Sequence, residues 1–201
     1  MTHYQRFRIE VRPSRATNDH EVRLFGDDVD LLSRLLENLG MDPDDILGET
    51  SPLRASDVPH RATVARCDCG EVGCGSAEVE IVRRGDLVVW TPDARDPYSF
   101  SAAAYDAELE RAIHDTSWET PDRTAARLCA LGVNRRRLAE SGLRFSWASG
   151  RVRPGSFTVS LQRDPDSHQV LVHLPWRDES PQEIADAMND LLSRPPGEWD
   201  D

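Results

Sequence analysis

Residues 62–90 read ATVARCDCGEVGCGSAEVEIVRRGDLVVW, and this stretch contains three strand-like runs separated by two turns. The three runs, each rich in β-branched and other apolar residues, are Ala62–Arg66, Ala77–Arg83 and Leu87–Trp90. Three cysteines occupy the first turn, and Gly85-Asp86 marks the second. The stretch therefore predicts a three-stranded antiparallel meander with the cysteines at its first turn.

Strand and helix patterns precede this meander. Apolar and charged residues alternate over Arg6–Arg12, which predicts a strand with one buried face, and Val22 begins a second, shorter strand. Asp27 or Asp28 is placed to cap a helix whose leucines recur at helical spacing, and Gly40 is placed to end it. A short helical turn follows Asp42-Pro43.

The patterns after the meander are mostly helical at first and then return to strands. Helices are predicted at Ala102–His114, from Thr120 to Gly132, and from Asn134 to Gly142. Three strand candidates follow, at Leu143–Ala148, Ser156–Arg163 and Gln169–Pro175. Ser180 and Glu183 form a capping box that begins the last helix.

The order of these elements predicts an α+β fold, with antiparallel β-meanders, packed helices, and two halves joined by a central helix. We expect an N-terminal α+β half at 1–100, a helical connector at 101–142, a βββα half at 143–194 and a loose tail at 195–201. A chain of 201 residues is long enough for an ordinary hydrophobic core.

The net charge of −12 argues against general affinity for nucleic acid or for anionic membranes, because both are polyanions. The charge is uneven, since residues 26–50 carry eight acidic residues and one arginine. Residues 134–153 reverse the sign, with six arginines and one glutamate. Two solvated faces that attract each other explain this pattern, and so does a patch that binds a partner or a small anion. For the second explanation the candidate residues are Arg135, Arg136, Arg137, Arg151 and Arg153.

The cysteine content and the absence of a long apolar run predict a cytoplasmic protein. No apolar stretch approaches the roughly 20 residues that a membrane helix needs. Four cysteines, three of them crowded and Cys129 within a helical pattern, do not resemble a disulfide framework.

The cysteine turn is the candidate metal site. Zinc is commonly held by four thiolate or imidazole ligands, and the turn supplies three. The candidate ligands are Cys67, Cys69 and Cys74, with His60 or a more distant side chain as the fourth. A glycine-rich hairpin with small buried thiols explains the same residues, and a redox switch between two of the thiols is a third interpretation.

Aromatic and basic residues also occur together near the start of the last sheet. Simple alternation places Phe145 and Trp147 on one buried face with Arg144 on the opposite face. Mixed aromatic and basic surfaces can bind single-stranded nucleic acid, but the negative charge of the chain disfavours this function. No serine lies in a G-x-S-x-G motif, so the sequence does not indicate an esterase.

These residues resemble a family of uncharacterised bacterial proteins that is common in actinobacteria. The resemblance rests on Ile46-Leu47-Gly48, on the Cys67-x-Cys69-Gly70-x-x-Gly73-Cys74 loop, and on the segments around Trp147 and Val170–Trp176. It implies a bacterial origin and a cytoplasmic location. The family has no assigned activity, so the resemblance implies none for this chain.

The sequence leads to three functional hypotheses. The first is a non-enzymatic interaction protein, such as an acidic antidote or accessory protein, whose segment 26–50 binds a basic protein partner. The second is a metal- or thiol-dependent enzyme centred on the cysteine loop, and the third is a module that binds small anions. Structural zinc is the only cofactor that the residues suggest.

Overall fold

The computed structural model describes residues 1–14, 19–35, 39–48, 50–67, 75–93, 95–163 and 168–199. The chain forms two compact units, Met1–Trp118 and Glu119–Asp201. Antiparallel strand pairs and helices occur in both units, which confirms the predicted α+β class.

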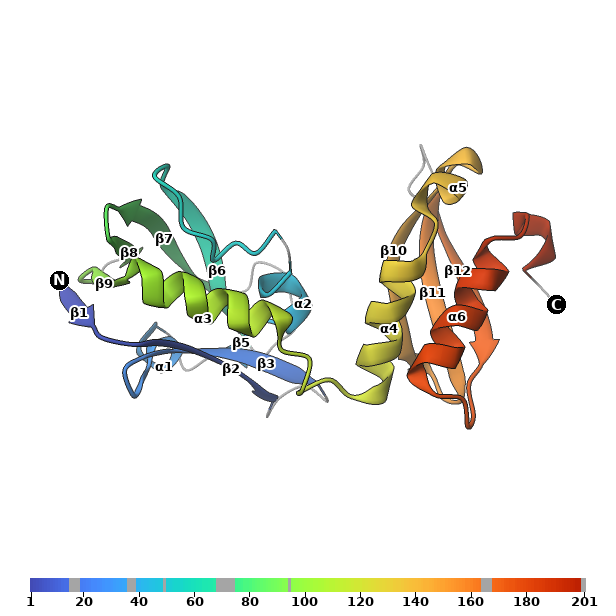
Figure 1. Cartoon of the computed structure of the whole chain (residues 1–201), viewed down its shortest axis with the longest axis horizontal. Coiled ribbons are helices and arrows are strands. Elements are labelled where there is room, and N and C mark those ends of the chain that lie inside the picture. Colours follow the sequence, from blue (N-terminus) through green and yellow to red (C-terminus); the bar gives the residue numbers. More distant parts are fainter. Residues whose placement is uncertain are drawn as a thin grey trace. The chain divides into compact units, whose positions relative to one another are not determined.

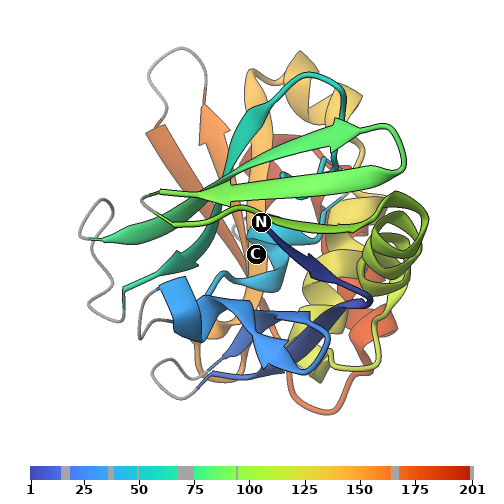
Figure 2. The same ribbon diagram turned by 90° about the vertical axis from the view of Figure 1, so that its left-hand side faces the viewer.

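The predicted meander is the centre of a six-stranded sheet in the first unit (Figure 2). It consists of β6 (His60–Arg66), β7 (Ser76–Arg84) and β8 (Leu87–Pro92), paired antiparallel in that order. β9 (Tyr98–Ser101) extends the sheet beside β8, and β1 (Thr2–Tyr4) pairs with β9 in parallel. On the other side β5 (Leu39–Gly40) pairs with the end of β6.

A second sheet in this unit contains β2 (Phe7–Pro13), β3 (His20–Gly26) and β4 (Val29–Asp30). Because β2 is an edge strand, its outward backbone groups need partners from elsewhere. The helix α3 (Ala102–His114) packs along β2 and supplies them. The Ile9 N–H donates to Glu108 Oε1 at 2.7 Å, and Arg111 Nη2 donates to the Ile9 carbonyl at 2.8 Å. Two side chains therefore replace a neighbouring strand at Ile9.

The helix predicted between Asp27 and Gly40 is shorter in the structure, where α1 covers Leu31–Leu35. Asp30 provides the cap, because its Oδ1 accepts the Leu32 N–H at 3.0 Å. Gly40 has a different role from the predicted helix stop. A Cβ atom at this position would lie 1.9 Å from the Val22 carbonyl oxygen, so glycine permits the close approach of two backbones. The predicted turn after Asp42 is confirmed as α2 (Pro43–Ile46).

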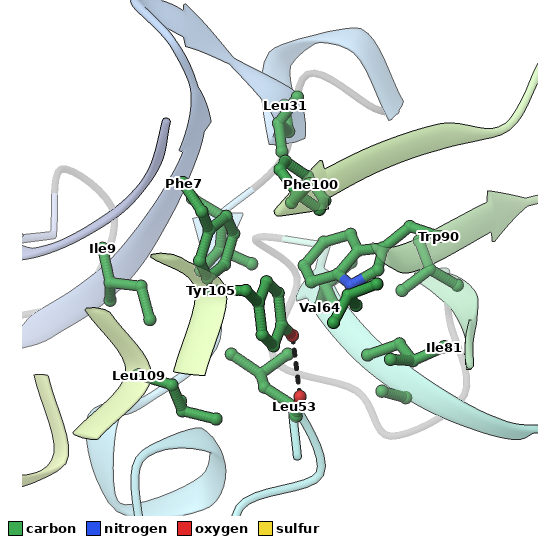
Figure 3. Close-up of a cluster of buried hydrophobic side chains, with 14 of the residues drawn as sticks. Phe7, Ile9, Leu31, Leu53, Val64, Ile81, Trp90, Phe100, Tyr105 and Leu109 are labelled. Carbon is green, nitrogen blue, oxygen red and sulfur yellow. Dashed lines mark hydrogen bonds between the residues drawn. The ribbon is translucent and has the colours of Figure 1, made fainter. Parts of the chain in front are cut away.

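The core of the first unit is built around aromatic rings (Figure 3). The rings of Phe7 and Tyr105 stack with centroids 4.4 Å apart, and Trp90 packs edge-on to Tyr105. The Tyr105 hydroxyl donates a hydrogen bond of 2.7 Å to the Leu53 carbonyl. Burial raises the pKa of Tyr105, so this group stays protonated and neutral in the core.

The second unit is a three-stranded antiparallel sheet with helices on one face (Figure 1). Its strands are β10 (Leu143–Arg153), β11 (Ser156–Arg163) and β12 (His168–Pro175). Two helices, α4 (Pro121–Gly132) and α6 (Pro181–Leu192), pack against each other. The short helix α5 (Arg135–Glu140) precedes β10. The predicted capping box at Ser180 and Glu183 is confirmed.

One side of this sheet forms the core of the second unit. Phe157, Val159 and Leu161 of β11 are fully buried with apolar side chains of the two helices. The chain after α6 differs from the predicted loose tail, because Pro196–Glu198 form a 3-10 turn and Trp199 is 7% exposed within the same core. Residues 200 and 201 lie outside the described part of the chain.

The predicted connector 101–142 is divided between the units. Its first helix, α3, belongs to the first unit, whereas α4 and α5 belong to the second. The boundary falls between Trp118 and Glu119. Among the residues that the structure describes, no helix combines the length and the apolar character needed to cross a membrane.

Candidate functional site

The cysteine loop follows directly from β6 and returns to β7. The Cys67 N–H donates to the Gly75 carbonyl at 2.9 Å, which closes the loop at its base. Cys67 is half-buried, and Gly75 has a φ of 127°, a conformation that favours glycine. Cys69 and Cys74 lie outside the described residues, so the zinc and redox hypotheses stay predictions.

His60 is poorly placed to complete a metal site with Cys67. The two residues lie at opposite ends of β6, which spans His60–Arg66. A strand rises about 3.3 Å per residue, so they are separated by about 20 Å, whereas ligands of one zinc ion lie within a few ångströms of each other. The His60 Nε2 atom instead lies 2.8 Å from the Pro52 carbonyl oxygen. Among the described residues, no group of three or more metal-ligating side chains is present.

Cys129 is the core residue that its helical pattern predicts. It is fully buried on α4, and its Sγ lies 3.6 Å from Asn189 Oδ1 on α6. Burial raises the pKa of Cys129 to about 12, so the thiol is protonated at neutral pH and is a poor nucleophile.

The five candidate arginines are not brought together. Arg135–Arg137 belong to α5, before the start of β10, whereas Arg151 and Arg153 lie at the far end of that 11-residue strand. A strand of this length spans about 30 Å, which is too long for one small anion to bridge. Contacts within the second unit also engage most of these side chains. Arg136 pairs with Glu140 at 3.3 Å, Arg137 bonds the Ser193 carbonyl, and Arg151 pairs with Asp122 at 2.9 Å.

Several carboxylates of the acidic segment 26–50 hold local structure. Asp27 accepts the Arg6 N–H at 2.9 Å. Asp30 binds the Arg23 guanidinium and caps α1, while Asp42 caps α2 by accepting the Asp44 N–H. These internal contacts explain part of the acidic composition of the segment, and the explanation requires no protein partner. Glu37 and Glu49 lie outside the described residues.

The first unit has an open hollow of about 920 Å³ beside the ends of the six-stranded sheet. Arg61 and Glu80 contribute to its lining, together with Asp93. Arg61 donates to Asp93 Oδ2 at 2.7 Å and to Glu78 Oε2 at 2.9 Å. Arg61 and Asp93 thus neutralise each other, and the remaining charged residues of the lining, Glu80, Arg95 and Asp96, include both signs.

The second unit has a sheet face that none of its described helices covers, which we call the open face. It comprises the side chains that alternate away from the helix-packed core: Arg144, Trp147, Ser149, Arg153, Ser156, Thr158, Ser160, Gln162, Gln169, Leu171, His173 and Pro175. No residue of β10, β11 or β12 is an aspartate or a glutamate, although the chain has 36 of them. The open face is therefore free of carboxylates in a strongly acidic protein.

The open face has small side chains along its centre and larger ones along its flanks. Trp147 and Leu171 lie in one row across the sheet, on either side of Ser160. Leu171 is 42% exposed, and Trp147 is half-buried. The central hydroxyls are already bonded within the sheet, because Thr158 Oγ1 lies 2.9 Å from His173 Nδ1 and Ser160 Oγ accepts from Gln169 at 2.9 Å. Thr158 and Ser160 are fully buried between the flanking side chains. The exposed residues of the face are Arg144, Arg153, Gln169, Leu171, His173 and Pro175.

Simple alternation misplaces Trp147 because β10 contains a bulge. The pairing with β11 shifts between Phe145 and Trp147, so Phe145 lies opposite Leu161 and Trp147 lies opposite Ser160. Phe145 therefore faces the core, and Trp147 shares the open face with Arg144. The absence of acidic residues from β10–β12 is visible in the sequence and is the signal that could have revealed this face.

Comparisons with protein-family models, with characterised proteins and with solved structures give no match to this chain. The resemblance to an actinobacterial family therefore stays a prediction.

Proposed function

We propose that this chain is a non-enzymatic interaction protein and that the open face is its docking surface for another protein. The proposal is carried by the composition of that face, where Trp147 and Leu171 lie on either side of Ser160 and the exposed Arg153 lies toward one end. Tryptophan and arginine are the residues most enriched among the energetic centres of protein interfaces. Burial of a half-exposed tryptophan and an exposed leucine would stabilise a complex through the hydrophobic effect.

The sign of the charge distinguishes this proposal from the expectation of a basic partner for segment 26–50. Contacts within the first unit use several carboxylates of that segment, and the open face has no carboxylate to offer. The open face favours a partner that brings negative charge to the exposed Arg153.

Capture experiments with three versions of the full chain test this proposal. Wild type, Leu171→Ser and Leu131→Ser would each be used to capture partners from an extract of the cells that produce the protein. Leu131 is 69% exposed on α4, away from the open face, and is the matched control. We expect the same protein to be captured by wild type and Leu131→Ser, and its yield to fall about tenfold with Leu171→Ser.

Equal capture by all three versions would place binding elsewhere on the chain and overturn the proposal. Failure of the wild-type chain to capture any protein would also count against it. Circular dichroism and thermal melting of each variant show whether the substitution has left the fold intact.

A further inference from the structure

The strand β12 forms one edge of the sheet in the second unit, where β11 is its one partner among the described strands. We infer that β12 pairs antiparallel with β12 of a second copy of this chain, so that two three-stranded sheets join into one sheet of six strands. The inference does not rest on the proposed function, because it concerns the backbone edge of the sheet and the proposed function concerns its open face.

The other sheet edges in the described part of the chain are protected against pairing with a further strand. The strands β1, β4 and β5 have only two or three residues each, and α3 covers β2. A bulge after Thr63 interrupts the pairing of β6, which also carries the exposed Arg61. The pairing of β10 is interrupted twice, and β10 carries three arginines. Short strands, covering helices, bulges and charged side chains all oppose association between sheet edges.

The strand β12 has none of these protective features over its eight residues, His168–Pro175. It contains no aspartate, glutamate, lysine or arginine, and its pairing with β11 runs through eight consecutive residue pairs without a shift. The valines at 170 and 172 favour an extended backbone. Among the described edges, β12 is therefore the one that is long, regular and uncharged enough to accept another strand.

The hydrogen bonds to β11 identify which backbone groups of β12 point outward. The Trp176 N–H donates to the Gly155 carbonyl at 2.9 Å, so Trp176 and every second residue before it bond to β11. The outward groups belong to the residues between them, Gln169, Leu171, His173 and Pro175. Because proline has no N–H, β12 presents three outward donors with Leu171 at their centre.

Two copies of β12 match each other when Leu171 of one lies opposite Leu171 of the other. Gln169 then lies opposite His173 and Val170 lies opposite Val172, so polar side chains meet polar ones and apolar side chains meet apolar ones. Each copy contributes three N–H groups and three carbonyls, which makes six hydrogen bonds across the edge. This symmetry favours a second copy of the chain over an unrelated strand.

Pro175 distinguishes this register from its neighbours. With Leu171 at the centre, Pro175 lies outside the paired segment. A shift by two residues in one direction would place Pro175 opposite Gln169, whose carbonyl would then have no donor. A shift in the other direction would move His173 beyond the start of the second strand at His168 and leave four hydrogen bonds.

The pairing also explains the exposure of Leu171, which is 42% exposed in the single chain. In the pair, the two Leu171 side chains would shield each other from water on the same side of the sheet. A contact between two strands of eight residues is small for a protein interface, so we expect an association that depends strongly on protein concentration.

Sedimentation equilibrium of the full chain at increasing concentrations tests the inference. The mass should rise from 22.6 kDa toward twice that value. Leu171→Lys and Leu171→Glu each place like charges opposite each other, so each should weaken the association about tenfold or more. A mixture of these two variants places lysine opposite glutamate and should restore the association. Leu131→Lys is the control, because Leu131 is an exposed leucine on α4.

Two further variants separate the backbone contact from the side chains of the open face. Gln169→Pro removes an outward N–H and none that bonds to β11, so it should weaken the association. Trp147→Ser changes the open face outside β12 and should keep the mass of wild type, whereas the proposed function predicts that it loses capture of another protein. Circular dichroism of each variant shows whether the fold is intact.

A wild-type chain that stays at the mass of one copy at every concentration would overturn the inference. So would an association that Leu171→Lys and Gln169→Pro leave unchanged, or one that Leu131→Lys weakens equally. If the mixture of Leu171→Lys and Leu171→Glu stays as weak as either variant alone, the two Leu171 side chains do not face each other and the inferred pairing is wrong.

Discussion

The first unit protects the edge of one of its sheets with side chains of its own helix, whereas the second unit has a sheet face that none of its described helices covers. In the first unit, Arg12, Arg23 and Arg61 each pair with a carboxylate, and α3 protects the edge of β2. In the second unit, the strands contain no carboxylate, and the helices cover one face only. This difference supports the proposal that the open face, and not a surface of the first unit, contacts another molecule.

The two hydrophobic clusters share no residue among those described, so the comparison predicts that each unit unfolds with its own core. Trp90 is fully buried in the first cluster. Trp90→Ala should lower the free energy of unfolding of the first unit by about 3–5 kcal/mol through a cavity. Hydrogen exchange should show faster exchange in Met1–Trp118 and unchanged protection in the second unit.

Phe157→Ala is the matching variant in the second cluster, where Phe157 is fully buried. It should give the reverse pattern of hydrogen exchange. If either substitution accelerates exchange equally across the whole chain, the two units fold as one and the comparison fails.

Gly40 tests how tightly the two sheets of the first unit approach each other. In Gly40→Ala the new Cβ would meet the Val22 carbonyl oxygen, and a backbone atom cannot move aside as a flexible side chain can. We expect a loss of about 3 kcal/mol of unfolding free energy, measured by urea denaturation. Gly48→Ala is the control, because its nearest neighbour would be 3.9 Å away. Similar losses in both variants would show that the close approach does not matter.

The protection of β2 by α3 should depend on pH. Burial alone would raise the pKa of Glu108, but hydrogen bonds from Arg111 and from the Ile9 N–H outweigh it and hold the pKa below its ordinary value of 4.5. A depressed carboxylate pKa contributes stability that is complete above the unfolded value and is lost as the pH falls through the folded value. Glu108→Gln should therefore cost about 1–2 kcal/mol at pH 7 and less at pH 3.

Denaturation of both proteins at several pH values measures this difference. Glu110→Gln is the control, because Glu110 pairs with Arg54 in solvent, where an ion pair adds little stability, so we expect a smaller loss at pH 7. A constant difference between wild type and Glu108→Gln from pH 7 to pH 3 would contradict the prediction.

The last prediction concerns the reactivity of the two described cysteines, which differ in burial. Cys129 is fully buried with its pKa raised to about 12, whereas Cys67 is half-buried at a loop. An alkylating reagent at pH 8 should modify Cys67 about a hundredfold faster than Cys129, as followed by mass spectrometry. Equal rates would contradict the placement of the two residues. Protection of Cys67 that a chelator removes, with zinc found by elemental analysis, would instead support a metal in the cysteine loop.

Local patterns predict most of the secondary structure because local signals define it. The capping box at Ser180 and the boundaries of α3 agree with the sequence, and so do the three strands of the meander. The parallel pairing of β1 with β9 could not be predicted in this way, since it joins short segments that are distant in sequence. The helix after Asp28 was predicted too long because its leucine pattern does not show that Leu39 pairs with Arg66.

The candidate site was less predictable than the fold, and the reason is a single residue. The extra residue of a β-bulge reverses the face of every following side chain, which moved Trp147 from the predicted core to the open face. The distance between His60 and Cys67 likewise depends on β6 being one continuous strand. Composition was the more robust signal, because the absence of acidic residues from β10–β12 does not depend on register.

The pairing of β1 with β9 also affects the order in which the protein is made. The Nδ1 atom of His3 lies 3.1 Å from the Oγ atom of Ser99, which is 96 positions later in the sequence. The Ile9 N–H donates a hydrogen bond to Glu108, which is 99 positions later. A nascent chain therefore cannot complete its first sheet until β9 has left the ribosome, and such distant pairings fold slowly. The strands of the second unit are consecutive in sequence, so each can pair with its neighbour as soon as both have been synthesised. During synthesis the first half stays incomplete for longest, although it begins to emerge first.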